Sequence, residues 1–262
     1  MNVQFVPFLL PLLFAHILTD FLIQTDADVR QKDKPLVLIK HGLTAGIISY
    51  LSLGIIDAWD IALGIMFSHT LLDALKMRSN KGTNLSRFVT HQGAHILILI
   101  LFSCAASGFK YHAISSLWTI FFGKGFLQAI TLISGGILSI FVGSFLVEYT
   151  FESFDFKDKK QTKSNPSENT TTDIYKNSGI KDGGKIIGYL ERSLIFLFIL
   201  AGYPAGIGFL IAAKSVFRFG ELTDPSRRQQ AEYIIIGTLL SILLGTSISF
   251  LTLEILRLIN LM

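Results

Sequence analysis

Histidine and aspartate recur at a four-residue spacing in very apolar parts of this sequence. His16 and Asp20 lie four residues apart in FAHILTDFLIQTD, with Gln24 four residues further on, and His69 and Asp73 repeat the spacing in FSHTLLDALK. Residues four apart share one face of an α-helix, so each pair presents an imidazole and a carboxylate together. Such donors suit Zn, Mn, Fe or Ni better than Ca or Mg, which prefer oxygen ligands. The spacing indicates a transition-metal site or, alternatively, a proton or ion pathway.

Three further histidines extend this pattern. His41 begins an apolar run, and THQGAH supplies His91, Gln92 and His95. On the helices expected below, five of the six histidines share one membrane depth, and only His112 lies elsewhere. The set exceeds the roughly three or four protein ligands of one catalytic zinc, so we expect one or two transition-metal ions, with zinc as the expected metal. The predicted metal ligands are His16, Asp20, His41, His69, Asp73, His91 and His95.

The surplus of polar groups also predicts catalytic roles. Asp20 or Asp73 could act as general base on a metal-bound water, and Lys76 could stabilise developing negative charge. Gln24 and Gln92 are expected to orient the ligands. Structural packing remains an alternative, because a histidine in a membrane helix can hydrogen-bond a neighbouring helix and an aspartate can pair with a nearby lysine.

Composition identifies the elements that must position these groups. Half of the 262 residues are hydrophobic, only 16% are charged, and the mean hydropathy is +0.53. Several apolar runs approach the roughly 20 residues that cross a bilayer, so we expect an all-α, polytopic integral membrane bundle with about six to eight membrane segments. The single cysteine, Cys104, excludes an intrachain disulfide. The expected spans are 3–25, 36–56, 59–77, 89–108, 126–149, 185–219 and 231–258.

Basic residues predict the orientation of these spans. Lysine and arginine gather in 26–40 and 76–88, whereas the turn at 57–60 has none. The positive-inside rule therefore places both basic loops in the cytoplasm and the N-terminus outside, with the His/Asp cluster at the cytoplasmic face. This distribution is typical of membrane orientation, and no nucleic-acid partner is expected.

The segment 185–219 contains GYPAG at 202–206. Because Pro204 lacks a backbone donor and glycine favours a turn, we expect two short helices that fold back as a membrane hairpin; a single plain span is the alternative.

The expected regions are 1–108, a four-helix membrane module carrying the cluster; 109–149, an interfacial segment and a fifth membrane helix; 150–184, a flexible cytoplasmic linker; and 185–262, the hairpin and the last transmembrane helix.

Four arginines near the C-terminal hairpin form a second candidate site. Arg192, Arg218, Arg227 and Arg228 could bind an anionic headgroup or phosphate, because arginine recognises phosphate with two parallel hydrogen bonds. A solvated ion-pair network with the neighbouring acidic residues is the alternative.

The chain resembles a known family at these motifs. HILTDFLIQ, the segment around His41, SHTLLDALK and THQGAH are similar to the bacterial inner-membrane family recorded as domain of unknown function 3307, over roughly residues 5–105. The run from GYLERS through GYPAG and FRFGEL to AEYIIIGTLLS also resembles the longer members of that family. The resemblance implies a multi-pass protein of the bacterial plasma (inner) membrane and brings no activity with it. SHTLLD is also similar to an SHLLLD-type segment of membrane-bound metal-dependent hydrolases, whose other histidine motif has no counterpart here.

These observations favour a metal-dependent hydrolase at the cytoplasmic membrane face that acts on a lipid-linked or phosphorylated substrate. A metal-ion or proton-coupled transporter is the second hypothesis, although the outer halves of the helices lack the acidic and histidine residues of a through-path. A non-enzymatic membrane regulator is the third. Membrane lipids are expected partners, and protein partners are left open.

Overall fold

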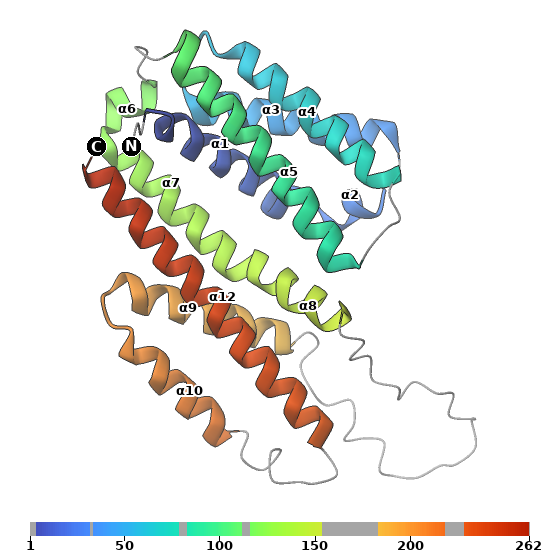
Figure 1. Cartoon of the computed structure of the whole chain (residues 1–262), viewed down its shortest axis with the longest axis vertical. Coiled ribbons are helices and arrows are strands. Elements are labelled where there is room, and N and C mark those ends of the chain that lie inside the picture. The colour runs from blue at the N-terminus through green and yellow to red at the C-terminus, as the bar shows by residue number, and fades with distance from the viewer. Residues whose placement is uncertain are drawn as a thin grey trace. The chain divides into compact units, whose positions relative to one another are not determined.

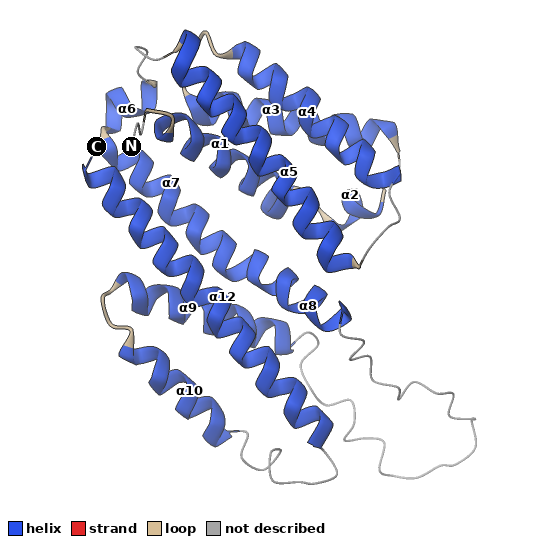
Figure 2. Ribbon diagram, in the orientation of Figure 1, coloured by secondary structure: helices blue, strands red, loops and turns tan. Residues whose placement is uncertain are grey.

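The computed structural model describes residues 4–31, 34–78, 83–111, 116–153, 183–217 and 228–261 (Figure 1). Figure 2 shows that the regular elements in these ranges are helices, and no strand occurs among them. The all-α prediction is therefore confirmed for the described residues. The chain divides into two compact units, one of 1–138 with 248–262 and the other of 139–247.

The first unit is built on long helices. α3 packs against α1 and α4, α5 packs against α1 and α4, and α7 packs against α1. The long helices are α1 (Val6–Leu18), α3 (Pro35–Leu53), α4 (Trp59–Arg78), α5 (Asn84–Ala105) and α7 (Lys124–Ile137). The short elements are the π-helical turns η1 (Thr19–Ile23) and η2 (Ala106–Lys110), with α2 (Asp26–Arg30) and α6 (Leu117–Phe122).

Helix α3 begins and ends at residues suited to those positions. Pro35 occupies its first turn, where a missing backbone N–H is harmless, and Gly54 follows its last residue with a φ of 61°. At α5, the hydroxyl of Thr83 accepts a hydrogen bond from the backbone N–H of Ser86 at 3.2 Å. These residues fix where α3 begins and ends and where α5 begins. Both helices carry candidate ligands.

Two glycines bring α3 close to α4. A Cβ added to Gly42 would lie 1.9 Å from Thr70 Oγ1, and one added to Gly46 would lie 2.9 Å from the Cβ of Met66. Glycines four residues apart allow helix backbones to approach closely, as in membrane helix pairs. His41 precedes the first of these glycines, so the close contact delivers its ring to α4.

The end of the first unit away from the His/Asp cluster has an apolar core. Tyr111 is buried in it, and its hydroxyl lies 2.7 Å from the Asp57 carbonyl oxygen and 2.7 Å from Asp60 Oδ1. The buried members of this core are Phe8, Leu12, Leu53, Ile55, Ala58, Ile61, Ile65, Leu99, Ala106 and Tyr111.

Five helical stretches are long and apolar enough to cross a membrane. Large apolar side chains remain exposed on outward faces, for example Phe67 on α4 and Leu101 on α5. Both features suit a membrane protein, while the expected number of membrane segments stays a prediction. The five stretches are Val6–Ile23, Pro35–Leu53, Asn84–Gly108, Lys124–Ser153 and Glu232–Leu261.

The second unit contains a helical hairpin. α9 ends at Leu200 and α10 begins at Ala205, Gly202 between them has a φ of 71°, and the two helices pack against each other (Figure 1). The predicted break at GYPAG is thus confirmed. The unit comprises most of η3 (Leu138–Val142), α8 (Gly143–Ser153), α9 (Gly183–Leu200), α10 (Ala205–Phe217) and the first part of α12 (Arg228–Leu261). The predicted linker lies mostly outside the described residues.

Candidate metal centre

The first predicted pair lies where α1 passes into a π-helical turn. His16 is in α1 and Asp20 is in η1, and His16 Nδ1 lies 3.8 Å from Asp20 Oδ1. Such turns are rare and occur frequently at functional sites. The helix then stops: Gln24 has an extended backbone, with φ −68° and ψ 117°. The expected stripe of three polar residues therefore ends at Asp20.

Asp20, His41 and His69 converge from three separate elements. His41 Nε2 lies 3.0 Å from His69 Nε2 and 3.3 Å from Asp20 Oδ1, and His69 Nε2 lies 3.2 Å from the same carboxylate oxygen. With ligands at about 2.0–2.1 Å, neighbouring donor atoms around a tetrahedral zinc ion lie about 3.3–3.4 Å apart. The three separations are close to that spacing.

Asp73, His91 and His95 form a second triad that shares no residue with the first. Asp73 Oδ1 lies 2.9 Å from His91 Nε2 and 3.9 Å from His95 Nε2, and the two imidazole nitrogens are 3.1 Å apart. α4 supplies the aspartate and α5 supplies both histidines. In each triad the potential ligand atoms lie within 4.8 Å of one another, as they do in an overlapping set of His16, His69 and His95.

The contacts of His41 are too numerous for hydrogen bonding alone. Its Nε2 lies 3.0 Å from His69 Nε2, 3.3 Å from Asp20 Oδ1 and 3.5 Å from Asp73 Oδ2. An imidazole nitrogen carries at most one proton, so it cannot bond to all three atoms at once. Lone pairs that converge in this way are the expected arrangement around a cation.

Gln92 bridges two of the predicted ligands. Its side-chain nitrogen donates to Asp20 Oδ2 at 3.1 Å, and its side-chain oxygen lies 2.9 Å from His16 Nε2. If His16 donates through Nε2, its Nδ1 is left with a lone pair. Gln24 makes no comparable bridge, because its buried Nε2 has no hydrogen-bond partner among the described residues. Lys76 lies in the final turns of α4, three residues beyond Asp73.

Burial makes this cluster expensive without a cation. The seven side chains are between 1% and 8% exposed. Two carboxylates buried among five imidazoles are costly to desolvate, and a divalent cation would offset their negative charge. His16 Nδ1 and Asp20 Oδ1 are buried and have no hydrogen-bond partner in the described part of the chain. The donor set and these unsatisfied atoms fit a transition metal.

Of the four arginines predicted to form an anion site, Arg192 alone has a described side chain. Arg192 lies in the second unit on α9. Arg218, Arg227 and His112 lie outside the described residues, and the side chain of Arg228 is not described. The anion site that groups these arginines stays a prediction.

The fold and the site define a helical bundle of membrane type with a buried His/Asp cluster. Residues 8–121 match the family described as "Protein of unknown function (DUF3307)", and this match supports the resemblance that the sequence predicted. The seven predicted ligands all fall within the matched residues. No curated protein and no solved structure matches the chain. The likeness to metal-dependent hydrolases gains no support from these comparisons.

Proposed function

We propose that the first unit is a metal-dependent hydrolase with two transition-metal ions, most simply zinc. The observation that carries this proposal is the pair of triads without a common residue, Asp20 with His41 and His69, and Asp73 with His91 and His95. Two ions sharing seven candidate ligands leave positions open for water or substrate, as catalytic sites require.

The chemistry proposed for the site is hydrolysis of a lipid-linked or phosphorylated substrate. A bound transition metal would lower the pKa of water toward neutrality and polarise an ester or phosphoryl oxygen. Asp20 or Asp73 would accept a proton from the attacking water. Gln92 would hold His16 and Asp20 in place, and Lys76 would stabilise the negative charge that develops on the substrate.

The proposed setting is the cytoplasmic face of a bacterial inner membrane. The basic loops that flank the cluster support this orientation through the positive-inside rule. The apolar core at the other end of the unit supports an enzyme over a transporter, because apolar residues such as Leu12, Leu53 and Ile65 fill that end in the part of the chain that the structure describes. A one-sided site suits a substrate that approaches from the membrane surface.

Metal analysis of the purified chain tests this proposal. Wild-type protein expressed with zinc should carry two ions per chain, one for each triad. His41→Ala should remove the ion of the first triad and Asp73→Asn that of the second, leaving about one ion in each variant. His112→Ala is the matched control, since it removes the only histidine outside the predicted ligand set.

Turnover is measured on the same preparations with phosphomonoester, phosphodiester and lipid-pyrophosphate substrates. Metal-dependent hydrolysis that both ligand variants lose and the control keeps would support the proposal. Folded wild-type protein without metal would refute the metal centre. Bound metal without hydrolysis of any of these substrates would refute the enzyme and favour transport or regulation.

A further inference from the structure

The second unit contains a cavity of about 490 Å³ that the proposed metal chemistry does not use. Helices α8, α9, α10 and α12 all contribute to its wall. The lining includes Arg192, Glu191, Lys214, Ser241, Phe151 and Tyr233.

Arg192 is the unusual group in this wall. Its side chain is only 2% exposed, yet no carboxylate pairs with it among the described residues. Its Nε and Nη2 donate to the Ile140 carbonyl at 3.2 and 3.0 Å, and its Nη1 donates to Ser241 Oγ at 2.9 Å. A guanidinium has five N–H donors, so these bonds leave two of them available. These acceptors are neutral, and among the described residues Glu191 acts on the buried guanidinium through its charge without a direct ion pair.

Its acidic neighbour is engaged elsewhere. Glu191 pairs with Lys214, whose Nζ lies 2.7 and 2.8 Å from the two carboxylate oxygens. Glu191 therefore forms its ion pair with Lys214 rather than with the adjacent Arg192. Lys214 lines the same cavity as Arg192 and brings a second cation to its wall.

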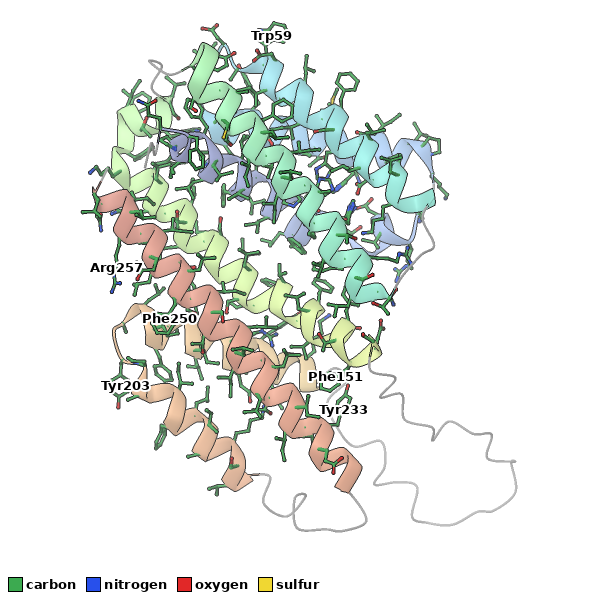
Figure 3. The ribbon with its side chains drawn as sticks, viewed as in Figure 1. Trp59, Phe151, Tyr203, Tyr233, Phe250 and Arg257 are labelled. Carbon is green, nitrogen blue, oxygen red and sulfur yellow. The ribbon has the colours of Figure 1, made fainter. Side chains whose placement is uncertain are left out.

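Small residues keep the space around Arg192 open. A Cβ on Gly188 would lie 3.2 Å from Arg192 Nη1, and a Cβ on Gly237 would lie 3.1 Å from the ring of Phe151. The Phe151 ring stacks on Tyr233 with centroids 4.0 Å apart, and Figure 3 shows the two side chains together. The cavity wall thus combines an aromatic pair with the cations Lys185, Arg192 and Lys214 and the carboxylates Glu148 and Glu191.

We propose that this cavity binds a phosphate group carried on a larger molecule. The two available N–H donors of Arg192 would contact phosphate oxygens, with Lys214 as the second cation. A volume of about 490 Å³ exceeds what an isolated phosphate fills, so the aromatic wall would contact the remainder of the ligand. The source is a phospholipid headgroup or a soluble phosphate ester. The site does not rest on the metal centre, which lies in the other unit.

Lipid binding to the full-length chain tests this assignment. The protein is delipidated in a neutral detergent and titrated separately with phosphatidylglycerol, glycerol 3-phosphate and a neutral diacylglycerol. Native mass spectrometry counts bound molecules, and thermal unfolding reports the shift in Tm. The wild type should bind one molecule of phosphatidylglycerol or of glycerol 3-phosphate per chain, and its Tm should rise. Diacylglycerol should have no effect.

Three variants separate binding from folding. Arg192→Lys keeps the charge but loses the planar guanidinium, so we expect the affinity for the phosphate ligand to fall about tenfold or more. Ser241→Ala removes one acceptor that positions Arg192, and we expect the affinity to fall severalfold. Arg257→Met is the matched control, because Arg257 is exposed and pairs with Glu254 on its own helix.

The two phosphate ligands distinguish the source. Binding of phosphatidylglycerol alone supports a headgroup site, whereas equal binding of glycerol 3-phosphate supports a site for soluble esters. In both cases Arg192→Lys must weaken the observed binding. Failure of both ligands to bind folded wild-type protein would overturn the proposal. Equal binding by wild type and Arg192→Lys would do so as well, and Arg192 would then only tie η3 to α12.

Discussion

Replacing Gly42 with alanine tests how the first triad is positioned. The new Cβ would lie 1.9 Å from Thr70 Oγ1, whereas ordinary contact begins at 3.4 Å. Relief by helix separation alone needs a movement of about 1.5 Å between α3 and α4. If Thr70 rotates away instead, the Met66 carbonyl at 3.1 Å still requires a few tenths of an ångström. His41 and His69, now 3.0 Å apart at Nε2, would move apart with the helices.

Metal sites tolerate about 0.2 Å of error in ligand distance, so either movement should impair the first triad. Asp73, His91 and His95 lie on α4 and α5 and should keep their ion. The metal content of Gly42→Ala should therefore fall from two ions per chain to about one. Overpacking of this kind costs about 1–3 kcal/mol, which should also lower Tm by several degrees. Metal analysis and thermal unfolding measure both effects.

Gly93→Ala is the matched control. Gly93 lies on α5 between the two histidines of the second triad, and an added Cβ would meet nothing within 4 Å. This variant should keep both ions and its full Tm. The double variant Gly42→Ala/Thr70→Ala removes the closest clash and should recover part of the lost metal. Wild-type metal content in Gly42→Ala would refute the role of the close α3–α4 contact.

Three further outcomes follow from the structure. Tyr111→Phe should lower Tm but leave the metal content unchanged, because the hydroxyl lies 2.7 Å from two oxygen atoms in the apolar core and donates its single proton there. Loss of metal in this variant would contradict the separation of the core from the cluster. Hydrogen bonds from Thr25 and the charge of Lys40 lower the pKa of Asp28 to about 2, so its stabilisation of α2 is present above pH 3.8 and is lost as pH falls through 2. Amide exchange of α2 should therefore approach that of Asp28→Ala below pH 2 and be slower than it at pH 6. Deletion of about ten residues within 155–183 should preserve Tm and expression, and a large loss of folded protein would show that this segment packs on the helices.

Local spacing predicted much of the His/Asp cluster. The pairs His16 with Asp20 and His91 with His95 lie together because four residues make about one helical turn. The break at GYPAG was also predictable, since Pro204 and its glycines act on their own backbone. These features depend on neighbours along the chain, so single-sequence reasoning reaches them.

Other features depend on partners far away in the sequence. Nothing local indicates that Arg192 bonds to Ile140 and Ser241, which are 52 and 49 residues distant. The π-helical turn that takes Gln24 off the stripe has no clear sequence signal. The contact of Gly42 with Thr70 could have been suspected from the spacing of Gly42 and Gly46, but the facing residue on α4 could not.

The polar face of α4 has a consequence for how the chain is made. α4 is not among the five stretches that pass as membrane spans on length and composition, whereas α3 is. An aspartate in an isolated helix opposes insertion by the translocon, by about 2.5–3.5 kcal/mol at the helix centre and by less toward the end, where Asp73 lies. In the proposed membrane setting, the cost of inserting Asp73 would fall only after α4 packs against neighbouring helices. α3 precedes α4 in the chain, and its Gly42 and Gly46 form the close contact between the two helices. Insertion of α4 would then proceed as a hairpin with α3, so the same step would also bring together His41 and His69, two members of the first triad.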